Sequence, residues 1–179
     1  MSDFDKAMPV ILAHEGGDQY TNRKNDRGGP TRWGITQRTL SYWRGEPVSA
    51  DAVAALTLDE ARRIYRNRYW DKCQLDQFTD QLVATKVFDM AVNLGPDTTI
   101  ELLQRAINLC MPMVRLRVDG WQGPKTIEAT NLCDPARLLS ALKMMQRHRY
   151  LEILAHDPTQ EENRAGWLSR AEWPNGDAP

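Results

Sequence analysis

Apolar residues recur every three or four positions along most of the chain, the spacing of helices that bury one face. Near the N-terminus this spacing predicts a helix over residues 3–14, whose apolar positions are Phe4, Met8, Ile11 and Leu12. The same spacing predicts later helices over residues 37–44, 57–71, 80–94, 97–111, 125–133, 136–155 and 160–171. The chain is therefore predicted to be mainly helical.

Several of these helices carry clear boundary signals. Thr57 and Glu60 have the spacing of a capping box, in which each side chain bonds the other residue's backbone N–H. Gly95 ends the helix over residues 80–94, and Pro96 prevents its continuation.

One polar segment interrupts the helical pattern. Residues 16–34 are rich in glycine, asparagine and aspartate, which favour turns, so a small hairpin or a three-stranded ribbon is predicted there.

The sequence pattern changes around residues 74–79, which suggests a boundary between two lobes. We therefore predict an N-terminal lobe over residues 1–73, a C-terminal helical lobe over 74–171 and a frayed tail over 172–179.

Composition narrows the possible functions. The 179 residues are 41% hydrophobic and 26% charged, as in a globular protein, and the net charge is −1. That charge gives no overall argument for nucleic acid or an anionic membrane as partner. Three widely spaced cysteines without a C-x-x-C pair predict buried, reduced thiols, with one disulfide as the alternative. Since the three histidines share no metal-ligand spacing, neither a metal nor another cofactor is expected.

The N-terminal segment lacks a basic stretch followed by a long apolar run, so no signal peptide is predicted. No segment approaches the roughly 18 apolar residues of a membrane span, so no stable membrane insertion is expected. We expect synthesis in the cytoplasm, with any target outside it reached through lysis or separate export.

Glu15 is the leading candidate for chemistry. It stands where the first predicted helix ends, and Gly16 and Gly17 follow it. The helix dipole and an apolar wall are both expected to raise the pKa of this carboxyl group, as a general acid requires. The alternative is a surface glutamate before an ordinary glycine helix stop.

Asp26, Thr31 and Thr36 are candidate partners of Glu15 in catalysis. A carboxylate or a hydroxyl group across a short hairpin would orient water or stabilise developing positive charge. Alternatively, Asp26 is a turn residue that bonds its own backbone, and Thr36 is the N-cap of the next helix.

An acid paired with a second carboxylate or hydroxyl is the minimum equipment for glycoside hydrolysis, so aromatic and amide side chains are candidate sugar contacts. Tyr20 and Trp33 would pack against pyranose rings, and Gly34 would leave space beside them. Asn93 lies four residues after Asp89 on one helix face, so it either bonds an acetamido group or joins a buried hydrogen-bond network. The remaining tryptophans singled out are predicted to lie in the core or to seal helix contacts: Trp43, Trp70, Trp121 and Trp167.

The order of these motifs resembles the glycoside hydrolase family 108 muramidases, the lysozyme-like phage endolysins and their bacterial relatives. Glu15-Gly16-Gly17, Asp26-x-Gly28-Gly29, Thr31 and Gly34-Ile35-Thr36 carry the first half of the resemblance. Tyr69-Trp70, residues 88–95, Leu103-Gln104 and Asp119-Gly120-x-x-Gly123-Pro124-x-Thr126 resemble the predicted peptidoglycan-binding region that follows in that family. Departures from the family pattern are Asp18, where an aromatic residue is usual, and a longer interval before Asp26.

The resemblance implies a mainly α, lysozyme-like fold, with an N-terminal helix and small hairpin lobe packed on a C-terminal helical bundle. It also implies peptidoglycan as substrate and Glu15 as the catalytic acid. Cleavage is expected between N-acetylmuramic acid and N-acetylglucosamine. The alternatives are a lytic transglycosylase that uses Glu15 alone and a non-catalytic wall-binding protein. A monomer is expected, which acts in the periplasm or cell wall after delivery by a holin or a secretion system.

Overall fold

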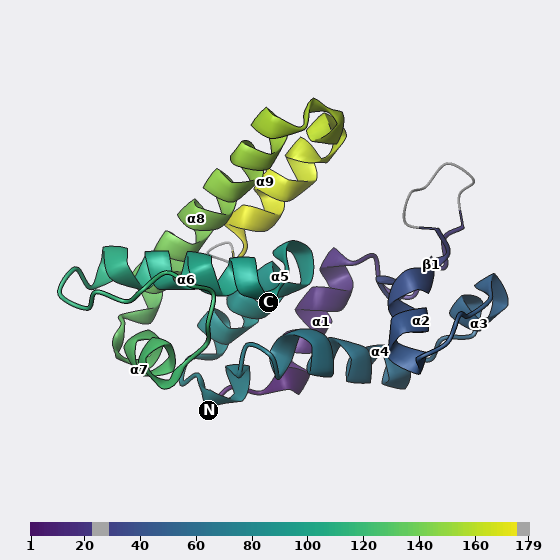
Figure 1. Ribbon diagram of the computed structural model, residues 1–179, viewed down its shortest axis with the longest axis horizontal. Coiled ribbons are helices and arrows are strands. Elements are labelled where there is room, and N and C mark those ends of the chain that lie inside the picture. Colours follow the sequence, from purple (N-terminus) through teal and green to yellow (C-terminus); the bar gives the residue numbers. More distant parts are fainter. Residues whose placement is uncertain (23–28, 175–179) are drawn as a thin grey trace. The chain divides into compact units, whose positions relative to one another are not determined.

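A computed structural model describes residues 1–22 and 29–174 of the chain. The chain divides into two compact units (Figure 1). The smaller unit runs from Phe4 to Arg68, and the larger joins Met1–Asp3 to the chain from Tyr69 onward. The predicted segments 1–73, 74–171 and 172–179 stay a prediction, and residues 175–179 of the predicted tail lie outside the described residues.

The smaller unit consists of short elements. In chain order they are α1 (Phe4–His14), β1 (Thr31–Arg32), β2 (Ile35–Thr36), α2 (Gln37–Arg44), α3 (Ala50–Ala54) and α4 (Leu58–Tyr65). A π-helical turn, η1 (Arg66–Trp70), continues α4 across the boundary between the units. The prediction of a helix over residues 57–71 was thus correct in extent, although its last turn is π-helical.

The two strands form an antiparallel hairpin in which Thr31 is opposite Thr36 and Arg32 is opposite Ile35. Thr21 adds a single bridge to Thr31, with both backbone N–H groups donating at 2.9 Å. The predicted hairpin or ribbon therefore exists: its first strand lies within the polar segment 16–34 and its second strand directly follows that segment.

Side-chain caps define the helices of the smaller unit. Thr36, Ser49 and Thr57 accept a hydrogen bond from the backbone N–H three residues later at the starts of α2, α3 and α4. The capping box is only half formed, because the Glu60 carboxylate accepts two bonds from Arg44 of α2 at 2.9 and 2.8 Å. These bonds hold the pKa of Glu60 below its usual value.

The larger unit is built from long helices. In chain order its elements after η1 are η2 (Leu75–Gln77), α5 (Gln81–Leu94), α6 (Pro96–Cys110), α7 (Pro124–Leu132), α8 (Pro135–His156), η3 (Pro158–Asn163) and α9 (Arg164–Glu172). Helix α8 packs against α5, α6 and α9, with α9 running beside it (Figure 1). The expectation of a mainly helical protein with a small hairpin is confirmed.

Polar groups are buried where α5 meets α9. Asp89 is fully buried and accepts a 2.9 Å bond from the Arg170 guanidinium. Lys86, also fully buried, donates through Nζ to the carbonyl oxygens of Arg170, Ala171 and Trp173 at 3.2, 2.9 and 2.6 Å. Burial lowers the pKa of Lys86 to about 8, against the opposing effect of Asp89. These bonds fasten the end of α9 to α5.

The cysteines are free, as predicted: Cys73 and Cys133 are buried, whereas Cys110 is half-buried. Burial raises the pKa of the Cys73 thiol to about 12. Within the described part of the chain no helix is both long and apolar enough to span a membrane. Residues 1–22 and 29–174 contain no cluster of three potential metal-ligating side chains.

Candidate active site

Glu15 directly follows α1, and its backbone N–H donates to Ile11 at 2.9 Å. Gly16 and Gly17 adopt φ values of +83° and +64°, and the Gly17 N–H returns to the Leu12 carbonyl at 2.8 Å. This is a Schellman-type helix end, which favours glycine because of its positive φ. The local sequence therefore ends the helix at the candidate acid and leaves the Glu15 side chain half-buried.

Trp33 and Gly34 form the two-residue turn of the hairpin. Both have positive φ, 53° and 72°, which is the requirement of a type I′ turn. Such a φ is uncommon for a tryptophan, so the surrounding structure has to hold it. The Tyr65 hydroxyl donates to the Trp33 carbonyl at 2.9 Å, and Trp33 Nε1 donates to the Leu56 carbonyl at 3.1 Å.

Gly34 brings the hairpin against the catalytic candidate. A Cβ placed on Gly34 would lie 2.8 Å from Cβ and 3.1 Å from Cγ of Glu15, and would collide with the Tyr65 hydroxyl. The turn, the Glu15 stem and the Tyr65 hydroxyl thus meet at one point of the smaller unit. Because no side chain fits at residue 34, the hairpin backbone packs directly on the Glu15 side chain.

The other predicted residues of this site have mixed placements. Thr31 Oγ1 donates to the Gly29 carbonyl at 3.0 Å, and Thr36 caps α2 through a 3.2 Å bond from Thr39 N–H. The N-cap alternative for Thr36 was therefore correct. Tyr20 is exposed, and Asp26 lies outside the described residues. The catalytic and sugar-binding roles of all four residues stay predictions.

Trp33 is more enclosed than a free sugar platform. Its indole N–H is bonded to the Leu56 carbonyl, and the Arg32 guanidinium lies 5.8 Å from its ring centroid. The Arg32 side chain also donates to the Ala54 carbonyl, so the hairpin is tied to the end of α3 and to the Leu56 segment after it. These bonds make Trp33 an anchor of the hairpin, and its sugar-binding role stays a prediction.

Asn93 belongs to the larger unit. It is exposed at the end of α5, where its Oδ1 accepts a 2.9 Å bond from the Tyr150 hydroxyl. That hydroxyl in turn accepts a 2.8 Å bond from Gln146 Nε2. Asn93 therefore participates in a side-chain network with Tyr150, but it is exposed rather than buried and Asp89 bonds Arg170 instead. Its contact with an acetamido group stays a prediction.

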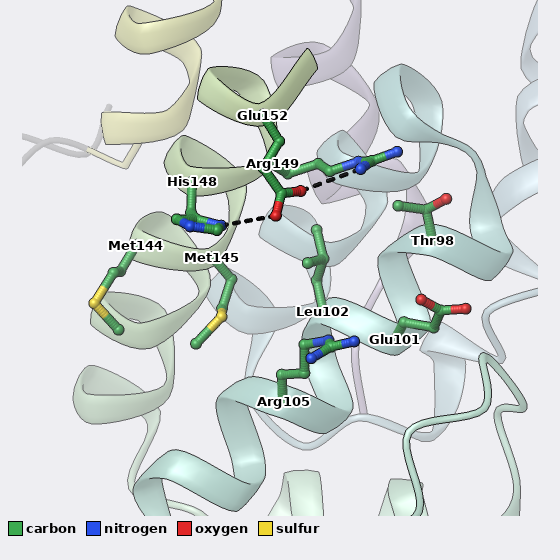
Figure 2. A pocket seen from close by; sticks show the side chains of 9 residues that line it. All are labelled: Thr98, Glu101, Leu102, Arg105, Met144, Met145, His148, Arg149 and Glu152. Atoms are coloured by element: carbon green, nitrogen blue, oxygen red, sulfur yellow. Dashed lines mark hydrogen bonds and ion pairs between the residues drawn. The ribbon is translucent and has the colours of Figure 1, made fainter. Parts of the chain in front are cut away.

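A groove of about 550 Å³ lies between α6 and α8 (Figure 2). Thr98, Glu101, Leu102, Arg105, Met144, Met145, His148, Arg149 and Glu152 line it. Glu152 pairs with Arg149 at 3.1 Å and lies 3.4 Å from His148, so these charges compensate one another along α8. With acidic, basic and apolar side chains together, its chemistry does not select one class of ligand.

Two residues correct the prediction from sequence. Trp121, predicted to lie in the core or seal a helix contact, is 68% exposed. Tyr65 was not singled out, yet its hydroxyl holds the turn beside Glu15. No local signal distinguishes Tyr65 from other aromatic residues, since its place at the hairpin arises from the packing of α4.

Comparison with known proteins identifies the class. Residues 8–95 match the family model described as glycosyl hydrolase 108, and residues 98–172 match the predicted peptidoglycan domain. The solved structure of Brucella abortus SagA is 33% identical to this chain, with a TM-score of 0.77. The alignment covers 94% of this chain and 89% of SagA. No curated protein matches the chain.

The protein is therefore a glycoside hydrolase that acts on peptidoglycan, with a peptidoglycan-binding domain after its catalytic segment. It belongs to the glycosyl hydrolase 108 family. The mainly helical, lysozyme-like fold expected from the resemblance agrees with the likeness to SagA.

Proposed function

We propose that the protein is an N-acetylmuramidase in which Glu15 is the general acid. The observation that carries the proposal is the packing of the Gly34 turn against the Glu15 stem, within the segment matched by the glycosyl hydrolase 108 model. A rigid backbone turn fixes where the carboxyl group can lie, and catalytic acids depend on such positioning.

In the proposed reaction, protonated Glu15 donates to the glycosidic oxygen between N-acetylmuramic acid and N-acetylglucosamine. The C–O bond breaks through an oxocarbenium-like transition state, and water adds to the anomeric carbon. Asp26 is the proposed partner carboxylate, with Thr31 or Thr36 assisting. Because Thr31 and Thr36 already make backbone hydrogen bonds, a positioning role suits them better than proton transfer.

A lytic transglycosylase is the alternative reaction. There Glu15 would still protonate the leaving oxygen, but a hydroxyl of the same sugar would attack in place of water and leave an anhydro product. The two reactions share the acid and differ in their products, so product analysis decides between them.

The proposed test is digestion of purified sacculi with the full chain, followed by mass spectrometry of the soluble fragments. Reducing N-acetylmuramic ends would support hydrolysis, and anhydro ends would support the transglycosylase instead. Glu15→Gln should reduce release by at least about 100-fold, as expected for loss of general-acid catalysis. Activity near the unmodified level in a folded Glu15→Gln protein would overturn the proposal.

Glu46→Gln is the matched control. It makes the same chemical change in the smaller unit at an exposed residue of the loop after α2, so release should stay at the unmodified level. If the unmodified protein binds sacculi but releases no fragment, the muramidase proposal fails and the non-catalytic wall-binding alternative is supported.

The biological setting is proposed on the substrate alone. Because peptidoglycan lies outside the cytoplasm, we propose action in the periplasm or cell wall, as a monomer delivered by a holin or a secretion system. An origin in a phage or prophage fits this proposal.

A further inference from the structure

Trp121 is the most exposed of the six tryptophans, and it lies in the loop between α6 and α7. The other five are buried or half-buried. Single exposed apolar side chains are common on protein surfaces, so the exposure of Trp121 gains meaning only from the bonds and packing that hold its loop. Trp121 also falls within residues 98–172, the segment matched by the predicted peptidoglycan domain.

A buried glutamine fixes the backbone that carries Trp121. Gln104 of α6, only 2% exposed, accepts through Oε1 from the backbone N–H groups of Asp119 and Gly120 at 2.9 and 3.1 Å. Its Nε2 donates to Asp119 Oδ1 at 3.0 Å and to the Trp121 carbonyl at 3.1 Å. Asp119 Oδ1 also accepts from the Trp121 N–H at 3.0 Å. The loop is therefore rigid before any ligand arrives.

The indole ring rests on Gly123. A Cβ on Gly123 would lie 2.5 Å from Cζ3, 2.8 Å from Cε3 and 2.9 Å from Cη2 of the ring. Gly123 has φ −92° and ψ 172°, a conformation open to any residue, so the ring rather than the backbone excludes a side chain here. Glycine thus sets the position of the Trp121 ring.

The neighbouring Gln122 has a buried side-chain amide without hydrogen bonds, which is unfavourable for folding. It is 4% exposed, and among the described residues neither oxygen nor nitrogen of its side-chain amide has a hydrogen-bond partner. The backbone carbonyl of Gln122 accepts a 2.6 Å hydrogen bond from Gln74 Nε2, so Gln74 also holds the loop. A segment that keeps an exposed indole beside a buried unpaired amide is held by its surroundings, as functional loops often are.

We propose that Trp121, in the larger unit, is a stacking platform for a pyranose ring of the peptidoglycan glycan strand. The C–H face of a sugar ring is apolar and packs on an aromatic surface, and a rigid tryptophan gives that contact with little loss of side-chain entropy. Preorganisation by Gln104 and Gly123 strengthens binding for the same reason. The inference rests on the proposed function in taking the glycan strand as the bound polymer.

Binding is tested with full-length Glu15→Gln protein, so that cleavage does not interfere. The probes are N-acetylglucosamine tetramer and peptide-free glycan strands, titrated calorimetrically. Trp121→Ala should weaken binding by about tenfold or more, the loss typical of a central aromatic contact. Trp121→Phe should restore most of it. Gly123→Ala should also weaken binding, because it displaces the ring without removing it.

Met113→Ala is the matched control. Met113 lies in the same loop region and is 95% exposed, so its removal tests nonspecific loss of apolar surface. Circular dichroism and thermal melting confirm that each variant is folded. Free stem peptide is titrated as a third probe. Unchanged glycan binding in Trp121→Ala would overturn the inference, as would an equal loss in Met113→Ala or a loss seen only with the stem peptide.

The outcomes separate this inference from the proposed function. If the unmodified protein releases no fragments from sacculi while binding still depends on Trp121, the muramidase proposal fails and the platform stands. If release depends on Glu15 but glycan binding does not depend on Trp121, the platform fails and the muramidase stands.

Discussion

The two units hold their key side chains in different ways. In the smaller unit, Glu15 follows a helix end and meets a two-residue turn whose residues both have positive φ. In the larger unit, long helices enclose charged groups, and Gln104 fixes the Trp121 loop from a helix. Reacting groups need a position set to a fraction of an ångström, whereas a binding surface needs rigidity over a wider area. The smaller unit therefore depends on backbone geometry, and the larger on buried side-chain bonds.

The largest stability effect is expected from Asp89→Ala in the larger unit. The substitution leaves the Arg170 guanidinium, whose side chain is 11% exposed, without its buried carboxylate. Loss of one partner of a buried ion pair costs about 3–5 kcal/mol in unfolding free energy. Denaturant unfolding measures this.

The matched control is Arg147→Ala, which removes an exposed pair with Glu172 in the same unit and should change stability little. Similar small effects from both substitutions would show that the buried pair does not hold α9 to α5.

An intermediate effect is expected from Gly34→Ala in the smaller unit. The new methyl group would collide with Tyr65 and the Glu15 stem, and alanine is strained at φ +72°. Overpacking and the positive φ together should cost about 2–4 kcal/mol. Fragment release from sacculi should fall by more than about tenfold, because Glu15 is displaced.

Gly45→Ala separates the two causes. Gly45 has φ +75° with no atom within 4 Å of the added Cβ, so it has the backbone strain without the collision. Its free energy of unfolding should fall by about 1 kcal/mol, and it should still release fragments from sacculi at the unmodified level. Equal loss of activity in both variants would show that the turn does not position Glu15.

The last effect is a pH dependence in the larger unit, which does not exceed the range expected for Gly34→Ala. The folded pKa of Lys86, about 8, lies below its ordinary value of 10.5, so between these pH values the unfolded chain binds more protons. Stability should therefore rise with pH across this window, by at most about 3 kcal/mol. Asp89, Lys143, Arg170 and Glu172 are the charged groups that act on this amine.

Lys86→Met provides the comparison for this pH dependence. The free energy of unfolding is measured in urea at pH 7.5 and pH 10. It should rise less, or fall more, between these pH values in the variant than in the unmodified protein. Cys73, whose folded pKa is about 12, acts in the opposite direction above pH 9 and is present in both proteins. Identical pH profiles would contradict the prediction for Lys86.

Local sequence signals predicted much of the secondary structure correctly. Helix α2 has the predicted bounds, Thr36 caps it, and Gly95 and Pro96 separate α5 from α6. The signals failed for α3, a five-residue helix too short to show periodicity, and for the Glu60 half of the capping box. In the latter case a tertiary partner, Arg44, took the carboxylate.

The sequence by itself determined where the helices other than α3 lie, that α1 ends beside Glu15, and which family the motifs resemble, because caps, glycines and apolar spacing act over a few residues. Only the tertiary structure decided that Gly34 and Tyr65 meet the Glu15 stem, and that Trp121 is exposed on Gly123. The contacts at Glu15 join residues far apart in the chain, and the Trp121 loop is held by Gln104 of α6, so both depend on how whole elements pack. The spacing of apolar residues shows which face of a helix is buried, but it does not show which other element that face contacts.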